Sequence, residues 1–232
     1  VEGAGGEAGV FAGDVSDAGA CGAAVDACVE RFGGLYGAFA NAGYGFEKSF
    51  LETTEEDWRG IFEVNVFGTI NLLRPAVRLM LERGEGHAVV CSSSIGKLAV
   101  PWYSAYCASK AAQWPIGHAL AGELRERGVY STTVHPIGTR TEFFDRARER
   151  SGGAGQVSDN TPGFLMQEPG VVARAIVRAL RRPRLEVWPG VAGRLTGVGA
   201  GLLTAFPWLA SLAGRGVARK KMAGRDLGVG SG

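Results

Sequence analysis

The chain has 232 residues, of which 46% are hydrophobic and 21% charged, as is typical of a soluble globular protein with one domain. Its formal net charge is +2 and it carries no recognisable nucleic-acid-binding motif, so we expect no nucleic-acid partner. The four cysteines form no C-x-x-C pair and there are three histidines. This composition argues against a metal site and favours a reducing, cytoplasmic location.

Predicted strands and helices alternate along the chain. Short apolar runs predict strands at 10–15, 35–40, 87–91, 129–134 and 185–188. Helices are predicted at 16–32, 57–81, 103–127 and 171–181. Continuous apolar strands separated by helices are typical of a parallel sheet that is covered on both faces. The sequence therefore predicts one α/β domain over residues 1–232, with a doubly wound parallel sheet.

Two stretches fall outside this alternation. Residues 139–168 are polar and rich in glycine, and we expect them to form a mobile substrate loop over the site. Residues 191–232 form an apolar and then basic extension, with no charge between Arg194 and Arg215. Pro207 interrupts any single membrane-spanning helix there. We favour a substrate lid or a dimer contact, and the basic residues that follow leave peripheral membrane attachment as an alternative.

A possible catalytic group is centred on Tyr106 and Lys110, which are four residues apart on a predicted helix and so share a face. A nearby ammonium stabilises phenolate, so we expect Lys110 to lower the pKa of Tyr106 and allow proton exchange near neutral pH. Ser93 ends a predicted strand and could hydrogen-bond the same substrate oxygen. Asn65 lies inside a predicted helix, where asparagine is unfavourable, and could hold a water that passes protons to Lys110.

Each of these pieces has an ordinary structural interpretation when it is taken alone. Tyr-x-x-x-Lys is usually a solvated helix face, and Asn41-Ala42-Gly43 could be only a tight turn. Asn65 could be a capping or surface residue, and His135 is better interpreted as structural. The order and spacing of the whole set indicate an active site at the carboxyl ends of the strands.

As a set, the motifs resemble the short-chain dehydrogenase/reductase family from about Val10 to Trp188. The resemblance is carried by Asp14-Val15, Asn41-Ala42-Gly43, Asn65, Ser92-Ser93-Ser94, Tyr106-x-x-x-Lys110 and Pro136-x-x-x-x-Thr141. It implies a Rossmann-like fold and hydride transfer between NAD or NADP and an alcohol or ketone. It also implies homodimers or homotetramers packed through the helices at 57–81 and 103–127.

The resemblance further implies catalytic roles. Tyr106 would be the general acid/base, and Ser93 would polarise the substrate oxygen. Lys110 would lower the pKa of Tyr106 and hold the nicotinamide ribose, and Asn65 would anchor the relay water. The uncharged C-terminal stretch indicates a small hydrophobic alcohol or ketone as substrate, such as a lipid or steroid-like molecule.

The cofactor-binding residues are likewise implied by the resemblance. Two would contact adenine, three would line the adenosine side, and the rest would follow the nicotinamide and pyrophosphate. In that order they are Asp14 and Val15; Asn41, Ala42 and Gly43; and Pro136, Thr139 and Thr141, with Tyr106 and Lys110 at the nicotinamide end.

The largest departure from the family is the absence of its first β-α-β unit, which carries the Thr-Gly-x-x-x-Gly-x-Gly phosphate loop. Gly3-Ala4-Gly5-Gly6 is too weak a substitute, because no strand precedes it. We therefore expect an N-terminally incomplete chain that is poorly stable and weakly active or inactive. The alternative is a non-catalytic scaffold of the same fold. Sugar-nucleotide epimerase or dehydratase chemistry is a third hypothesis, disfavoured by the short region after Pro136.

Overall fold

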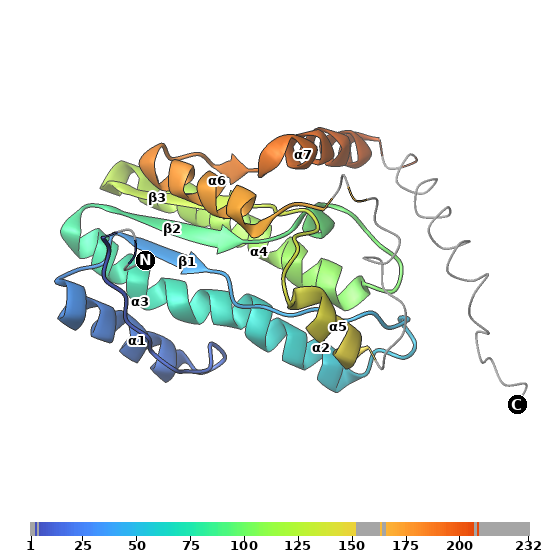
Figure 1. The fold of residues 1–232 in the computed structure, drawn as a ribbon, viewed down its shortest axis with the longest axis horizontal. Coiled ribbons are helices and arrows are strands. Elements are labelled where there is room, and N and C mark those ends of the chain that lie inside the picture. The colour runs from blue at the N-terminus through green and yellow to red at the C-terminus, as the bar shows by residue number, and fades with distance from the viewer. Residues whose placement is uncertain (1–2, 4, 152–162, 164–165, 207, 209–232) are drawn as a thin grey trace, which may run out of the picture.

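The protein is described here by a computed structural model, which covers residues 3, 5–151, 163, 166–206 and 208. Helices pack around a four-stranded sheet of order β1-β2-β3-β4, in which every neighbouring pair is parallel (Figure 1). The strands are β1 (Gly37–Ala40), β2 (Gly86–Cys91), β3 (Val129–Val134) and β4 (Glu186–Val187). The predicted Rossmann-like parallel α/β architecture is confirmed.

The described helices comprise seven α-helices and three shorter helical segments. The α-helices are α1 (Ala18–Phe32), α2 (Glu55–Phe62), α3 (Gly68–Arg83), α4 (Ser104–Leu124), α5 (Phe143–Arg150), α6 (Pro169–Arg181) and α7 (Gly190–Ala205). The shorter segments are a π-helix at Glu63–Phe67 and 3-10 helices at Ser94–Lys97 and Arg125–Arg127.

The main apolar core lies between one face of the sheet and helices α1, α3 and α4. Alternate sheet residues point toward these helices, because successive strand side chains face opposite sides. The buried members of this core are Val25, Ala38, Ala40, Leu73, Ala76, Val77, Met80, Ala88, Val90, Leu124 and Val129. Helix α6 covers the other face, where its Leu180 carbonyl accepts a hydrogen bond from the Tyr36 hydroxyl at 3.4 Å.

The register of the sheet brings the ends of its strands to one edge. Ala40 lies opposite Val90, Cys91 lies opposite Val134, and Val134 lies opposite Val187. The segments that follow β1, β2 and β3 therefore leave the sheet side by side, as expected for the site of an open parallel sheet.

The strand predicted at residues 10–15 is wrong. The chain there is irregular up to Asp14 and turns at Val15 and Ser16, and the side chain of Val10 is 99% exposed. A strand is stabilised by its ladder of hydrogen bonds, and none of the described strands pairs with this segment. Its end is fixed instead by the Asn71 side chain, which donates to the carbonyls of Val15 and Ser16 at 3.0 and 3.1 Å.

Three further segments differ from the sequence predictions. The helix predicted at 57–81 begins at Glu55 and contains one π-helical turn before α3. Helix α4, predicted at 103–127, begins at Ser104 and contains Pro115. The stretch 139–168, predicted as a loop, contains helix α5, and its residues 152–162, 164 and 165 lie outside the described part.

Candidate active site

The first turns of α4 hold the predicted acid/base residue. Tyr106 and Lys110 are one turn apart on this helix, and Ser93 lies two residues past the end of β2. The Ser93 side chain lies near enough to the Tyr106 phenol to lower its pKa, although burial acts more strongly in the other direction. Two residues from separate elements, thirteen apart in sequence, thus meet at the carboxyl edge of the sheet.

Lys110 is buried under this edge, with 4% of its surface exposed. Its Nζ donates to the Cys91 carbonyl at 2.8 Å, and its own carbonyl accepts from the Ser92 hydroxyl at 2.7 Å. Burial lowers the pKa of Lys110, because a desolvated ammonium is less stable. Lys110 therefore links α4 to the end of β2 by hydrogen bonds.

The pKa of Tyr106 differs from our expectation. Burial raises it well above the usual value, and the lowering influence of the nearby Ser93 side chain is too small to offset this. The Lys110 ammonium lies 6.0 Å from the centre of the Tyr106 ring and is bonded to Cys91 instead. In this arrangement Tyr106 is a protonated phenol at neutral pH.

Asn65 is fully buried on the π-helical turn and bonds in three directions. Its Oδ1 accepts from the Tyr44 amide, and its Nδ2 donates to the Tyr44 carbonyl and to the Ser109 hydroxyl, each at 2.9 Å. Both amide hydrogens are therefore used. Ser109 in turn donates to the Tyr106 carbonyl at 2.9 Å. The geometry makes Asn65 a positioning residue for the Tyr106 turn, and its role as anchor of a relay water stays a prediction.

The Asn65 carbonyl is also hydrogen-bonded within the protein. It accepts from the Gln113 side chain at 2.7 Å and from the Thr69 hydroxyl at 2.8 Å. A π-turn frees carbonyls from the regular helical pattern, and such turns are common at functional sites. Sequence reasoning missed Gln113, although it follows Tyr106 by seven residues and so lies on the same face of α4.

The segment after β1 packs closely against these groups. A Cβ at Gly43 would lie 2.9 Å from Asn65 Oδ1 and 3.3 Å from Lys110 Nζ. A Cβ at Gly45 would lie 3.0 Å from the Tyr106 ring and 3.1 Å from Phe143. Asn41-Ala42-Gly43 is thus more than a tight turn, because only glycine fits between Asn65 and Lys110.

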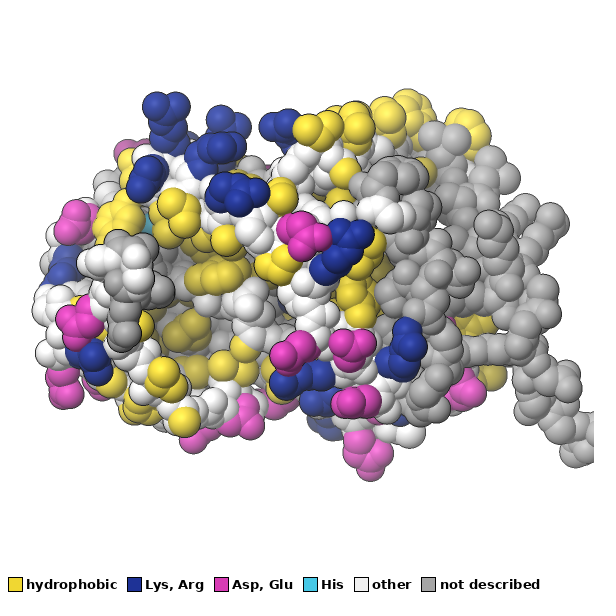
Figure 2. Space-filling view, viewed as in Figure 1, with side chains coloured by type: hydrophobic (Ala, Val, Ile, Leu, Met, Phe, Trp, Pro, Cys, Tyr) yellow, Lys and Arg dark blue, Asp and Glu magenta, His cyan; other side chains and the backbone are white. Residues whose placement is uncertain are grey.

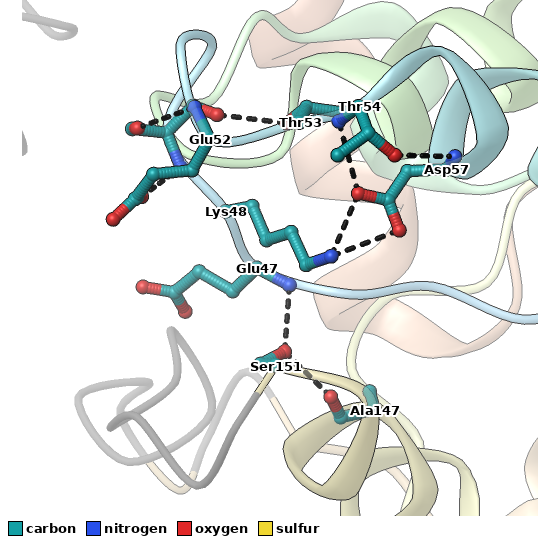
Figure 3. Close-up of polar contacts among 9 residues, drawn as sticks. Glu47, Lys48, Glu52, Thr53, Thr54, Asp57, Ala147 and Ser151 are labelled. Carbon is teal, nitrogen blue, oxygen red and sulfur yellow. Dashed lines mark hydrogen bonds and ion pairs between the residues drawn. The ribbon is translucent and has the colours of Figure 1, made fainter.

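The segment from Glu47 to Thr54, called here the rim of the site, is held in place by hydrogen bonds and an ion pair (Figure 3). Lys48 Nζ pairs with the Asp57 carboxylate at 2.7 Å, and Asp57 forms a capping box with Thr54 at the start of α2. The Ser151 hydroxyl, at the end of α5, accepts from the Glu47 amide at 2.8 Å. These bonds join the rim to α2 and α5 and hold Phe143 of α5 near Tyr106, with ring centres 5.6 Å apart.

Aromatic side chains line the wall of the site beside Tyr106. Phe46, Ile61 and Ala105 form a small buried cluster, and partly buried side chains pack around it. These are Tyr44, Trp58, Phe62 and Tyr106. The side of the site reached by Tyr106 is therefore apolar.

The predicted adenine-side residues lie along the start of α3. Ser16 donates two hydrogen bonds to the exposed Asp14 carboxylate, and these lower the pKa of Asp14. A Cβ at Gly68 would lie 2.8 Å from the Val15 side chain. Val15 therefore packs against the first turn of α3, one turn beyond Asn65 along the chain.

The segment after β3 completes the edge. The Pro136 carbonyl accepts from the Ser94 amide at 2.9 Å and from the Ser93 hydroxyl at 3.4 Å. Thr139 pairs with Gln167, and the Gln167 side chain donates to its hydroxyl at 3.2 Å. Thr141 Oγ1 accepts from the Phe143 amide at 3.4 Å, at the start of α5.

A polar cluster centred on Glu186 lies behind Ser93. Its carboxylate accepts from the indoles of Trp114 and Trp188 at 2.6 and 3.2 Å and lies 3.2 Å from Lys97. Burial opposes ionisation, but these partners and His135 outweigh it and lower the pKa of Glu186 to about 2. His135 is buried and stacks on Trp188, and burial lowers its pKa to about 4, which supports a structural role.

Comparison with known proteins agrees with this geometry. Residues 1–152 match the short chain dehydrogenase family, which is more than half of the chain. The chain belongs to the short-chain dehydrogenase family. Family membership implies a nicotinamide cofactor. The position of Ser93, Tyr106 and Lys110 at the carboxyl edge of the sheet is compatible with such a cofactor.

Several curated relatives of this short-chain dehydrogenase are similar over part of their length. It is 29% identical to dehydrogenase/reductase SDR family member 7B of Bos taurus over 174 residues, 75% of this chain and 53% of the relative. It is 33% identical to uncharacterized oxidoreductase YbbO of Escherichia coli K12 over 60% of this chain and 48% of the relative. An uncharacterized NAD-dependent oxidoreductase of Mycobacterium tuberculosis is 38% identical over 118 residues, half of this chain and 43% of the relative. The chain spans about half the length of these curated relatives.

Solved structures show the same fold. A short-chain dehydrogenase from Streptomyces avermitilis is 29% identical and superposes with a TM-score of 0.69, covering 87% of this chain and 80% of that one. ElxO with NADP bound is 22% identical, with a TM-score of 0.65 and coverage of 75% and 74%. The second likeness concerns the fold alone.

The fit to a nicotinamide cofactor is partial in the short-chain dehydrogenase described here. Gly43 keeps the backbone close to Lys110, and Pro136, Thr139 and Thr141 border the same edge. Within the described residues, no glycine-rich turn joins a strand to the start of a helix. Two surface cavities of about 340 and 440 Å³ lie elsewhere, and neither is lined by Ser93, Tyr106 or Lys110.

Proposed function

We propose that this protein is an NAD(P)-dependent oxidoreductase that interconverts a hydrophobic alcohol and its ketone or aldehyde. The observation that carries the proposal is the gathering of three side chains at the carboxyl edge of the sheet: Ser93 acts on the pKa of the Tyr106 phenol, and Lys110 is buried one turn further along α4. A phenol and a hydroxyl placed next to each other can both bind a single substrate oxygen. The order of the candidate catalytic residues along the chain also supports an oxidoreductase.

Each side chain of the site has a separate role in the proposed reaction. Tyr106, protonated in the structure because its pKa is raised, donates a proton to the substrate oxygen during reduction and takes it back during oxidation. Ser93 holds and polarises that oxygen. Lys110 fixes the Tyr106 turn to β2, and its positive charge favours the phenolate state when the proton leaves. Asn65 orients the turn through Ser109.

The nicotinamide cofactor supplies or accepts the hydride when it is bound. Lys110 would hold the nicotinamide ribose, with Pro136, Thr139 and Thr141 beside the nicotinamide and pyrophosphate. Asp14, Val15 and the segment Asn41 to Gly43 would face the adenosine end. The proposal covers both NAD and NADP, because one relative is named NAD-dependent and one neighbour of the same fold holds NADP.

A hydrophobic substrate is supported by the wall beside Tyr106. Phe143 lies 5.6 Å from the Tyr106 ring centre, and Tyr103 lies 6.5 Å from it. Apolar surface of this kind favours an apolar substrate body over a sugar, whose hydroxyls would lose their hydrogen bonds to water. Assembly as a homodimer or homotetramer through α3 and α4 is part of the proposal.

The test begins with binding of NADH and NADPH to the purified chain, followed by nicotinamide fluorescence, and then with turnover of apolar ketones and small sugars. The Tyr106→Phe change should lower turnover by a factor of about a hundred or more while cofactor binding and folding persist. Tyr130→Phe, at a half-exposed position of β3, is the matched control and should leave turnover unchanged.

Two results would contradict the proposal. A Tyr106→Phe protein with full turnover would remove the assigned acid/base. A folded chain that binds neither cofactor would favour the scaffold hypothesis instead. Faster turnover of small sugars than of apolar ketones would remove the substrate class alone.

A further inference from the structure

Helix α7 exposes its large apolar side chains. Val191, Leu195, Val198 and Leu202 are each between 52% and 69% exposed and follow one another at helical spacing along one face. Phe206 continues the face beyond the helix, at 49% exposure. A contiguous apolar stripe of this kind marks an interaction site, whereas single exposed apolar residues do not.

The opposite face of α7 is built from small residues and is packed inward. Gly193 and Ala200 are buried, and a Cβ at Gly197 would lie only 2.7 Å from the Trp188 ring. Close approach to the indole therefore requires glycine at this contact. The helix is held with its apolar stripe outward because only its small face fits against the protein.

Exposed arginines gather next to this stripe. Arg174, Arg178 and Arg181 lie on α6, and Arg182 and Arg184 follow it, all of them exposed. Figure 2 shows cationic side chains over α6 and hydrophobic side chains over α7 along one edge of the molecule. The edge thus combines positive charge with apolar surface.

Negative charge is missing from this edge. Between Pro169 and Phe206 the sequence has one acidic residue, Glu186, which is turned inward to Lys97 and the two indoles. A partner that is both apolar and anionic would complement this edge.

We infer that the outer edge formed by α6 and α7 docks this protein on an anionic lipid bilayer surface. The apolar stripe would enter the boundary between headgroups and acyl chains, and the arginines would meet the anionic headgroups. No described helix is long and apolar enough to cross a membrane. A second copy of the chain fits the edge less well, because it would bring the arginines of both copies into one interface without acidic partners.

The edge also lies close to the candidate active site. Helix α7 packs beside the 3-10 helix Ser94–Lys97, which directly follows Ser93. Docking through α7 would therefore place the carboxyl edge of the sheet near the bilayer surface.

The experiment is a flotation assay with vesicles of phosphatidylcholine alone and of phosphatidylcholine with about 30 mol% phosphatidylglycerol. The full chain should bind the anionic vesicles at least about tenfold better than the neutral ones, and added salt should weaken the binding. The triple variant Leu195→Ser, Val198→Ser, Leu202→Ser should lose about tenfold or more. The variant Arg174→Gln, Arg178→Gln, Arg181→Gln should lose about as much at low salt.

Matched controls use the same kinds of residue on other elements. Phe50→Ser with Leu51→Ser removes exposed apolar side chains before α2, and Arg74→Gln with Arg78→Gln removes exposed cations from α3. Both should bind like the unchanged chain. Equal losses in controls and test variants, or no preference for anionic vesicles, would overturn the inference. So would a dimer that the serine variant dissociates while vesicle binding stays unchanged.

Discussion

Helices α4 and α7 depart from the usual placement of polar and apolar residues in opposite directions. Helix α4 buries Ser109, Lys110 and Gln113, which a solvated helix would expose. Helix α7 exposes Leu195 and Leu202, which a packed helix would bury. In α4 Ser109, Lys110 and Gln113 each make at least one hydrogen bond, whereas the side chains of the apolar stripe of α7 stay more than half exposed.

The difference shows two ways in which function can override packing. Buried polar groups cost free energy unless they are bonded, so those of α4 remain only because Asn65 and the end of β2 satisfy them. Exposed apolar groups cost less, but a contiguous stripe of them is unusual on a monomer. Sites where local rules fail are where function is expected.

The largest effect should come from breaking the polar network around α4. Asn65→Ala removes three hydrogen bonds and leaves the Tyr44 amide and the Ser109 hydroxyl without this partner. We expect a loss of about 3 kcal/mol in the free energy of unfolding. Urea unfolding followed by circular dichroism measures it.

Asn71→Ala is the matched control for that change. Asn71 lies on the next helix, α3, and donates to two carbonyls of a partly exposed turn, so we expect a loss of only about 1 kcal/mol. Equal losses at the two positions would mean that Asn65 is an ordinary helix residue. The hydrogen bonds around α4 would then contribute no more to the free energy of unfolding than those of an ordinary helix.

Regular elements were predictable from the sequence where the signal is local. The strand at 129–134 was predicted with the observed bounds, because a continuous apolar run identifies a buried parallel strand. The run at 10–15 was also predicted as a strand and forms none, because pairing depends on a neighbour that the run does not specify. Local pattern therefore gives the element but not its partner.

The candidate site shows the same limit. The order of Ser93, Tyr106 and Lys110 was enough to predict that they share one edge. The bonds of Asn65 to Tyr44 and Ser109 were not predictable, because they depend on a π-turn and on the path of the segment after β1. The raised pKa of Tyr106 likewise follows from burial, which the spacing of two residues does not reveal.

An intermediate effect is expected from Glu186, which joins the two helices through Trp114 of α4 and Trp188 beneath α7. Its pKa falls from 4.5 to about 2, so the ionised form contributes stability above pH 4.5 that is lost as the pH falls toward 2. Between pH 6 and pH 3 the unchanged chain should lose about 2 kcal/mol more than Glu186→Gln.

Urea unfolding at the two pH values measures this difference. Glu55→Gln, in an exposed pair with Arg59, is the matched carboxylate change and should follow the unchanged chain, because exposed ion pairs contribute little. The same pH dependence in Glu186→Gln and the unchanged chain would show that the carboxylate is not held by its indole partners.

The smallest effect should come from the glycines of α7, which separate its inward and outward faces. Gly197→Ala gains about 1 kcal/mol in helix propensity but places a methyl against the Trp188 ring, which costs about 1–3 kcal/mol, so we expect a net loss of about 1 kcal/mol. Gly201→Ala meets nothing within 4 Å and should gain about 1 kcal/mol. Thermal unfolding followed by tryptophan fluorescence compares the two variants. Opposite shifts of the transition are expected, because the same methyl enters a filled contact in one case and open space in the other. Equal gains would mean that α7 does not rest on Trp188, and the outward direction of its apolar stripe would lose its structural cause.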